Sequence, residues 1–325
     1  MILGVPIVAR QSQFWLLLLT MLVSASGASC PQFIYMNRAA GPRVLPEAPT
    51  MTDVMRVVNG NTGLVQSLYT EHASVSVPLM VSLRARLAVE RPRRLHLWAD
   101  TRFTGPEVDL GSNDELFWFW AKRNPMPAIF YCRHDQFSTS AARSVLPVEP
   151  DWLIEALGLT TFDPNVAHRG PTPVGGRLRI ETPLQTLQGP MTKVTFVDES
   201  QGWVLAQHLY DAQGKLAASA VSSHHWRDPG TGAVLPTRIE LQTPATDTMQ
   251  QFSLRLELND LQVNKLTPNP QLWTMPTIEG FTPLNLADPN LRVGSPPAAG
   301  MPAGAPASVG APAGAARPLR PQVRY

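Results

Sequence analysis

The stretch of sequence that decides the fold runs from residue 81 to residue 120 and reads VSLRARLAVERPRRLHLWADTRFTGPEVDLGSNDELFWFW. In its first third, apolar and polar side chains alternate: Leu83 and Leu87 fall on one side, and Arg84 and Arg86 on the other. A two-residue period places successive side chains on opposite faces of a strand. This alternation predicts a sheet with one apolar face and one polar face, as expected of a protein that binds apolar material.

The same kind of pattern continues on both sides of this stretch, and turn residues such as those at 111–114, 211–214 and 228–232 separate its segments. The pattern predicts a mainly β, α+β protein whose antiparallel meander has about ten or more strands. The predicted strands are 73–77, 81–90, 93–102, 107–111, 116–122, 127–134, 178–181, 193–198, 204–210, 216–226, 234–243 and 251–258.

Two segments interrupt the strands with a helical pattern. Apolar residues at spacings of three and four predict an amphipathic helix over Met51–Tyr69 that covers an open face of the sheet. Gly60 and Gly63 lower its helix propensity by about 1 kcal/mol each. A second, short helix is predicted over Pro150–Gly158, capped near Asp151 and stopped by the glycine. It is a lid or plug, or else an ordinary connection between the halves of the sheet.

The two ends of the chain differ from its middle in composition. Residues 1–29 have an apolar core at 14–23 followed by small residues, the layout of a secretory signal peptide. That core is shorter than the roughly 20 residues of a membrane-spanning helix, although an uncleaved anchor is the alternative. Residues 30–50 are a linker, 51–290 form one domain, and the tail at 291–325 is rich in Ala, Pro and Gly. Such a tail buries too little apolar surface to fold and is expected to be disordered.

Cys30 directly follows the predicted signal peptide, and Gly27-Ala-Ser-Cys30 resembles the lipobox of bacterial lipoproteins. In that motif the cysteine is acylated after cleavage, which would anchor the chain to a membrane. The motif usually has Leu where this chain has Gly27. Ordinary cleavage near Ala28 is the alternative. A retained Cys30 thiol has one intramolecular partner for a disulfide, Cys132.

No catalytic, metal-binding or nucleic-acid-binding pattern is found in the sequence. The 27 basic residues nearly balance the 25 acidic ones, so no electrostatic footprint for nucleic acid is present. His224 and His225 are adjacent in a predicted strand and point to opposite faces, so they do not chelate one ion. Cys132 and His134 lack an orienting third group and an oxyanion pocket. The chain is therefore predicted to be no enzyme and to need no cofactor and no metal.

Two features favour an apolar cavity. The run Leu116–Trp120 offers large side chains to both faces of one strand. The run Leu216–Ser223 consists almost entirely of small residues, which leaves space above a curved sheet. That space is either a cavity for a ligand or is filled by a helix that packs closely on the strand.

The segments 90–98 (ERPRRLHLW) and 111–120 (GSNDELFWFW), together with the signal peptide and the first helix, resemble the LolA/LolB lipoprotein carrier and receptor superfamily. The resemblance extends over about residues 51–283. It implies an unclosed antiparallel β-barrel, a half-barrel covered by a few helices, with an apolar cavity for lipoprotein acyl chains. A lipidated Cys30 would be closer to the membrane-held receptor, and the Ala/Pro tail belongs to neither pattern.

The resemblance also assigns residues and a location. Arg91, beside the corner proline, matches the arginine that latches the lid helices, or else it is an exposed corner charge. The chain is expected to cross the inner membrane and to stay in the periplasm or anchored to the outer membrane. Its expected partners are lipid acyl chains or lipoproteins, and the alternative is a structural or interaction protein whose sheet fills itself. The residues expected to contact lipid are Leu83, Leu87, Leu95, Leu97, Phe117, Trp118 and Phe119.

Overall fold

The computed structural model describes residues 42–78, 82–124, 126–137, 150–186, 189–245, 251–288 and 291. The predicted signal peptide, Cys30 and residues 292–325 lie outside the described residues, as does most of the predicted linker. From Val44 onward the described residues belong to one unit. All that follows concerns this unit.

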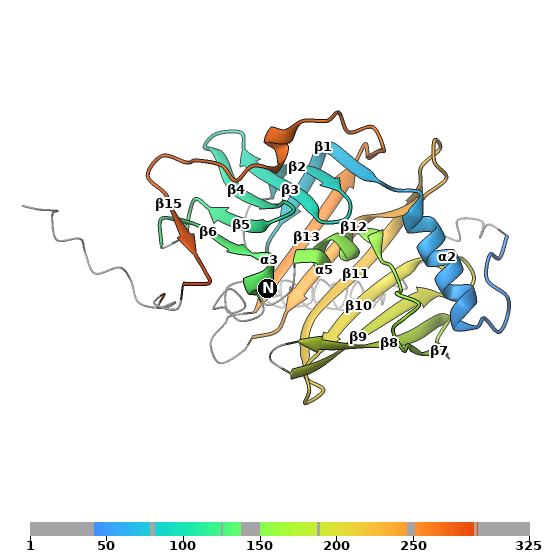
Figure 1. Cartoon of the computed structure of the whole chain (residues 1–325). Helices are drawn as coiled ribbons and strands as arrows, with labels where there is room; N and C mark the ends of the chain where they lie inside the picture. Colours follow the sequence, from blue (N-terminus) through green and yellow to red (C-terminus); the bar gives the residue numbers. More distant parts are fainter. Residues whose placement is uncertain are drawn as a thin grey trace, which may run out of the picture. The chain divides into compact units, whose positions relative to one another are not determined.

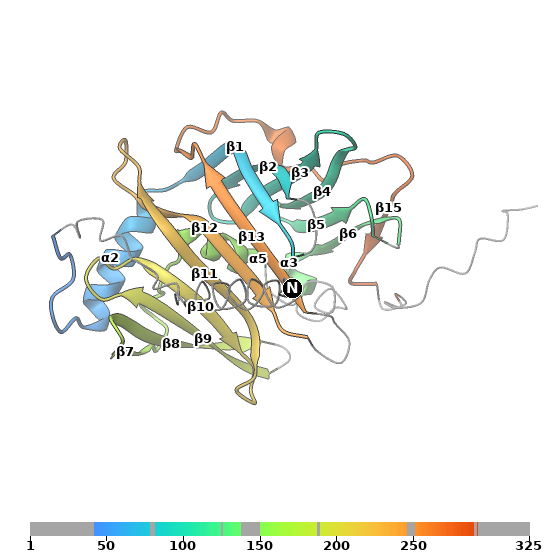
Figure 2. The same cartoon turned by 180° about the vertical axis from the view of Figure 1, so that it is seen from behind.

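One large sheet contains every described strand (Figures 1 and 2). Its order is β15-β6-β5-β4-β3-β2-β1-β13-β12-β11-β10-β9-β8-β7, with β14 paired to β1. All pairings are antiparallel except that of β15 with β6. In the described part of the chain β15 and β7 end this path without pairing to each other, so the barrel is unclosed, as predicted. The strands are β1 (Ser67–Ser76), β2 (Leu83–Glu90), β3 (Arg94–Thr101), β4 (Gly105–Ser112), β5 (Leu116–Ala121), β6 (Ala128–Arg133), β7 (Arg169–Val174), β8 (Arg177–Thr186), β9 (Gly189–Asp198), β10 (Val204–Tyr210), β11 (Leu216–Arg227), β12 (Val234–Thr243), β13 (Phe252–Asn259), β14 (Gln262–Val263) and β15 (Thr282–Asn285).

The alternation that predicts the strands also sets the two faces of the sheet. Directly opposite residues lie on the same face, and the register pairs Leu87 with Leu97 and Val89 with Leu95. Leu87, Val89 and Leu95 belong to the main apolar core, and Leu97 packs against it. We call the face that carries them the inner face, and the opposite one the outer face.

The first helix, α2 (Met51–Gly63), is shorter than predicted. Thr50 and Asp53 form a capping box at its start, and Leu64 is its C-cap. The prediction that this helix reaches Tyr69 is wrong, because β1 begins at Ser67 and pairs with both β2 and β13. The low helix propensity of the glycines near the end of α2 is outweighed by the hydrogen bonds and burial that the segment gains as a strand.

The second predicted helix is present as two short pieces, α5 (Pro150–Ile154) and the π-helix η1 (Glu155–Leu159). We call residues 150–159 the plug. Gly158 has a φ of 92°, a conformation that glycine adopts without a Cβ clash. The plug lies against the inner face (Figure 1), and η1 contacts β10, β11 and β12. Its buried apolar side chains are Trp152, Ile154, Ala156, Leu157 and Leu159.

Residues 264–281 cross the outer face of β3 to β6, and the chain then pairs with β6 and places Leu286 in the inner-face cluster of Phe117. We call residues 264–288 the strap; it contains the 3-10 helix η2 (Pro270–Trp273) and β15. Met275, Ile278 and Phe281 of the strap pack on a cluster formed by Trp118, Trp120 and Ile129. A short helix, α3 (His134–Phe137), follows β6. The outer face of β5 and β6 is therefore covered by the chain itself.

Candidate functional site

The inner face beside the plug brings together six of the seven residues expected to contact lipid. Leu87 and Leu95 are buried in the main core with the plug, and Leu83 and Leu97 pack against that core. Further along the same face, a second apolar cluster contains two more of them. Its members are Phe117, Phe119, Ala128, Phe130, Cys132, Phe137 and Leu286.

The structure places Trp118 on the outer face instead, because it lies between Phe117 and Phe119 in β5 and strand side chains alternate. Its ring is fully buried, and its indole N–H donates to Asp109 Oδ1 at 2.7 Å. The same carboxylate oxygen lies 2.9 Å from His96 Nε2. His96 Nδ1 in turn lies 2.6 Å from the carbonyl oxygen of Leu272 in the strap. Trp118 thus belongs to the attachment of the strap.

Two ion pairs attach the plug to the sheet. Arg93 makes a bidentate pair with Asp151 of α5, with distances of 3.1 Å and 2.9 Å. Lys193 Nζ on β9 lies 2.6 Å from Glu155 Oε2 of η1, and the Lys193 side chain is only 9% exposed. The first pair is exposed to solvent on both sides, so its contribution to stability is about 0–1 kcal/mol. The second pair is largely shielded from water.

Arg91, the expected lid latch, contacts the end of α2. Its Nη1 donates to the carbonyl oxygens of Thr62 at 3.0 Å and of Val65 at 3.3 Å. Its backbone N–H donates to the carbonyl of Gln66. Thr62 lies in the last turn of α2 and Val65 just after its C-cap, so Arg91 holds the chain where the helix ends. The arginine that bonds the plug is Arg93, two residues further on.

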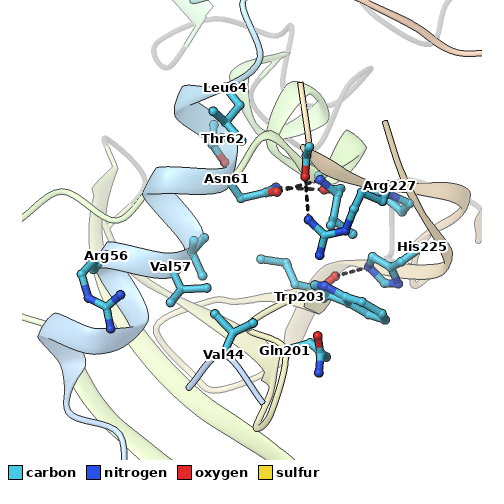
Figure 3. Close-up of a pocket in the computed structure, with 17 residues that line it drawn as sticks. Val44, Arg56, Val57, Asn61, Thr62, Leu64, Gln201, Trp203, His225 and Arg227 are labelled. Atoms are coloured by element: carbon cyan, nitrogen blue, oxygen red, sulfur yellow. Dashed lines mark hydrogen bonds between the residues drawn. The ribbon is translucent and has the colours of Figure 1, made fainter. Parts of the chain in front are cut away.

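A pocket of about 270 Å³ lies between α2 and the ends of β10, β11 and β12 (Figure 3). Gly158 of the plug and Pro236 are among its lining residues, so it borders the space that the plug fills. The rings of Trp203 and His225 stack with centroids 5.0 Å apart. Burial lowers the pKa of His225, whose Nε2 lies 3.1 Å from the carbonyl oxygen of Val204. The wall contributed by α2 and β12 combines apolar residues, among them Val57 and Val234, with the polar residues Arg56, Asn61 and Thr62.

Cys132 and His134, the pair weighed for catalysis in the sequence, do not hydrogen-bond to each other. Cys132 Sγ donates to the carbonyl of Arg133 at 3.3 Å, while His134 Nε2 lies 2.9 Å from the carbonyl oxygen of Asn113. Burial lowers the pKa of His134. Within the described ranges no group of three or more His, Cys, Asp or Glu side chains is placed to hold a metal ion. Nor does any helix in those ranges have the length and apolar character needed to cross a membrane.

The sequence analysis missed the polar residues that hold the plug. Lys193 occupies a position in β9 whose neighbours on the same face include Met191 and Val197, so a charge there was the available signal. Asp151 and Glu155 are four residues apart, the spacing of one helical face. Their partners are distant in sequence, and no local pattern identifies them.

No family model matches the chain, and no curated protein matches it. The solved structures that are similar to this chain include the following three. One is a domain from Vibrio parahaemolyticus described as outer membrane lipoprotein-sorting, with 10% identity, a TM-score of 0.45, and coverage of 67% of this chain and 95% of that one. A LolA superfamily protein from Nitrosomonas europaea has 11% identity, a TM-score of 0.39, and coverage of 68% and 97%.

The third, a DUF1329 family protein from Desulfovibrio piger, has 11% identity, a TM-score of 0.44, and coverage of 68% and 96%. The first two are described in terms of the superfamily that the sequence resembles.

Proposed function

We propose that this chain is a non-enzymatic binder of lipid acyl chains or of lipoproteins in the cell envelope. The observation that carries the proposal is the way the inner face is filled. The apolar wall of the half-barrel is covered by the plug, a short helical segment that is not itself a strand of the sheet. A segment of this kind can leave the wall without breaking any strand pairing, and an acyl chain can take its place.

The free energies of the two occupants are of similar size. Four large apolar side chains of the plug contribute roughly 1.5–3 kcal/mol each when buried. An acyl chain contributes about 0.8 kcal/mol per methylene, so a chain of roughly ten methylenes gives about 8 kcal/mol. Exchange between plug and acyl chain is therefore nearly balanced. Near balance suits a protein that must both take up and release its ligand.

Arg91 and Arg93 are proposed to set how easily α2 and the plug, the two segments that cover the sheet, move away from it. Arg93 holds α5 through Asp151, and Arg91 holds the end of α2. The two covers border the pocket shown in Figure 3. An arginine beside the corner proline would then act as a latch on α2, with the neighbouring arginine acting on the plug.

Residence in the envelope is part of the proposal and is supported by the predicted signal peptide at 1–29. Acylation of Cys30 would add a membrane anchor. Both lie outside the described residues. Cleavage and acylation are tested together by the intact mass of protein purified from its own envelope, before and after extraction with organic solvent.

The main test follows the plug directly. Trp152 is a buried residue of the plug, so its fluorescence should shift to longer wavelength when a fatty acyl ligand displaces it into water. The Trp152→Phe variant should still bind but lose the shift, whereas the control Trp98→Phe, on the outer face, should keep it. Lipid that neither copurifies with the chain nor binds to it would refute the proposal and favour the second candidate.

The second candidate is a structural or interaction protein without a ligand. It is favoured by one observation: the small residues of β11, Ala218 and Ala220, are covered closely by η1 in this structure. On that reading the plug is a permanent part of the core.

A further inference from the structure

The inner face carries a group of buried polar side chains in the region that the plug covers. Lys193 and Thr195 lie on β9, Gln207 on β10 and Ser222 on β11, with exposed fractions of 7%, 0%, 2% and 7%. Thr195 is directly opposite Gln207 in the register, so the two share a face. We call these four residues the polar seat. Buried polar groups cost free energy unless they are paired, so the polar seat needs a group that provides hydrogen-bond or ion-pair partners.

In this structure, η1 occupies the polar seat with one carboxylate and two backbone carbonyls. Glu155 Oε2 lies 2.6 Å from Lys193 Nζ. The Gln207 amide donates to the carbonyl of Glu155 at 3.2 Å, and Ser222 Oγ donates to the carbonyl of Ala156 at 3.5 Å. Buried apolar side chains of Leu157 and Leu159 follow immediately. The occupant is thus an anion joined to oxygen acceptors and then to apolar groups.

This occupant leaves part of the seat unsatisfied. Thr195 Oγ1 and Gln207 Oε1 are buried and have no hydrogen-bond partner among the described residues. Most buried polar atoms in native proteins are paired. The Thr195 hydroxyl has a hydrogen bond to donate that η1 does not use, and an anion accepts such a bond, whereas Gln207 Oε1 only accepts and gains nothing from an anion. Both belong to adjacent strands of the rigid sheet, so they stay in place when the plug leaves.

We infer that the ligand of the inner face carries an anionic head group, a carboxylate or a phosphate, which replaces Glu155 on Lys193 while its alkyl chain replaces the apolar side chains of η1. This inference rests on the proposed function. Glu155 is then an internal substitute for the head group that keeps Lys193 paired in the absence of ligand. An uncharged acyl chain would leave Lys193 buried without a counter-charge, which is strongly unfavourable.

The test is calorimetric titration of the full chain with dodecanoate, its uncharged methyl ester and dodecyl phosphate. A hydrogen bond to a charged group is worth about tenfold or more in affinity, so dodecanoate should bind at least about tenfold more tightly than the ester. Lys193→Met should abolish this preference. The matched control Lys215→Met, at an exposed position in the turn between β10 and β11, should keep it. The tighter of dodecanoate and dodecyl phosphate identifies the head group.

Equal affinities for dodecanoate and the ester in the unmodified chain would overturn the anionic inference and leave acyl binding intact. Failure of all three compounds to bind would overturn the proposed function itself. Should Lys193→Met not fold, Glu155→Gln serves instead. Removing the competing carboxylate should tighten dodecanoate binding more than ester binding, and an unchanged ratio would count against the inference.

Discussion

At the scale of single residues, the contact between Gly111 and Trp118 shows how the outer face is packed. A Cβ added to Gly111 would lie 2.0 Å from the ring of Trp118, which is fully buried and bonded to Asp109. The ring cannot move aside, because the strap covers it. Glycine is required at this position for lack of space, although the strand pattern alone would accept a side chain.

We therefore expect Gly111→Ala to destabilise the fold by about 1–3 kcal/mol through overpacking. Thermal unfolding should show a melting temperature lower by several degrees. The control is Gly60→Ala in α2, where an added Cβ meets nothing within 4 Å. That change should raise stability by about 0.5–1 kcal/mol, because alanine favours the helix. Equal melting temperatures for Gly111→Ala and the unmodified chain would contradict the packing described.

A second residue-scale prediction concerns pH. Burial lowers the pKa of His225, and this effect outweighs the bond to the Val204 carbonyl and the charge of Asp198, while nearby His224 acts with burial. In the unfolded chain a histidine binds its proton near pH 6.5. Below about that pH the unfolded state takes up a proton more readily than the folded state, so stability falls as the pH falls.

Unfolding by urea at pH 7.5 and pH 5.5 should show this loss in the unmodified chain. In His225→Phe the loss should be smaller, since one of the groups responsible is gone, although stability at pH 7.5 should drop by about 0.5–1.5 kcal/mol with the lost hydrogen bond. The same pH dependence in both proteins would exclude His225 as a contributor.

At the scale of elements, α2 and the plug are two separately attached covers. Arg91 bonds the last carbonyls of α2, and Arg93 bonds Asp151 of α5. The Arg93 and Asp151 side chains are 40% and 46% exposed, so their pair limits opening of the plug without deciding global stability.

Hydrogen exchange followed by mass spectrometry should therefore separate the two arginines. In Arg93→Leu, peptides from residues 150–159 should exchange faster by less than about tenfold, because an exposed pair is worth about 1 kcal/mol or less. In Arg91→Leu the faster exchange should appear at the end of α2, around residues 59–66. Each variant is the control for the other. Faster exchange of both segments in both variants would show that the covers open together.

At the scale of the whole molecule, the strap shields the apolar side chains on the outer face of β5 and β6 from water. It places Met275, Ile278 and Phe281 over Trp118 and Trp120, and it adds β15 beside β6. Without it, a cluster of large aromatic side chains would face water. An exposed apolar patch of this kind promotes association.

A chain truncated after Lys265 should bind a hydrophobic dye and form soluble aggregates in size-exclusion chromatography. A chain truncated after Leu291 keeps the strap and loses only the Ala/Pro/Gly-rich tail, so it should elute and melt like the full chain. Aggregation of the second truncation, or a monomeric and stable first truncation, would show that the strap is not what protects the outer face.

The strand pattern of the sequence determined the mainly β, antiparallel architecture and most of the strands, while the unclosed barrel was implied by the family resemblance. The ranges predicted for β10 and β12 coincide with those observed, at 204–210 and 234–243. The reason is that strand alternation is a local pattern, in which the polarity of each residue indicates the face of the sheet on which its side chain lies. The position of the plug, Pro150–Leu159, could also be read from the sequence, because helix capping and a terminal glycine are local signals.

The tertiary structure decided which residues distant in the sequence contact each other. Only the fold ended α2 at Gly63 in favour of β1, added the exposed edge strand β7, and placed Trp118 under the strap rather than toward the plug. It also paired Lys193 with Glu155, 38 positions away in the chain. Such outcomes depend on which distant partner offers the most burial and the best hydrogen bonds. The polarity of a residue indicates whether it needs a hydrogen-bond or ion-pair partner when buried. Which residue becomes that partner depends on the packing of the whole chain.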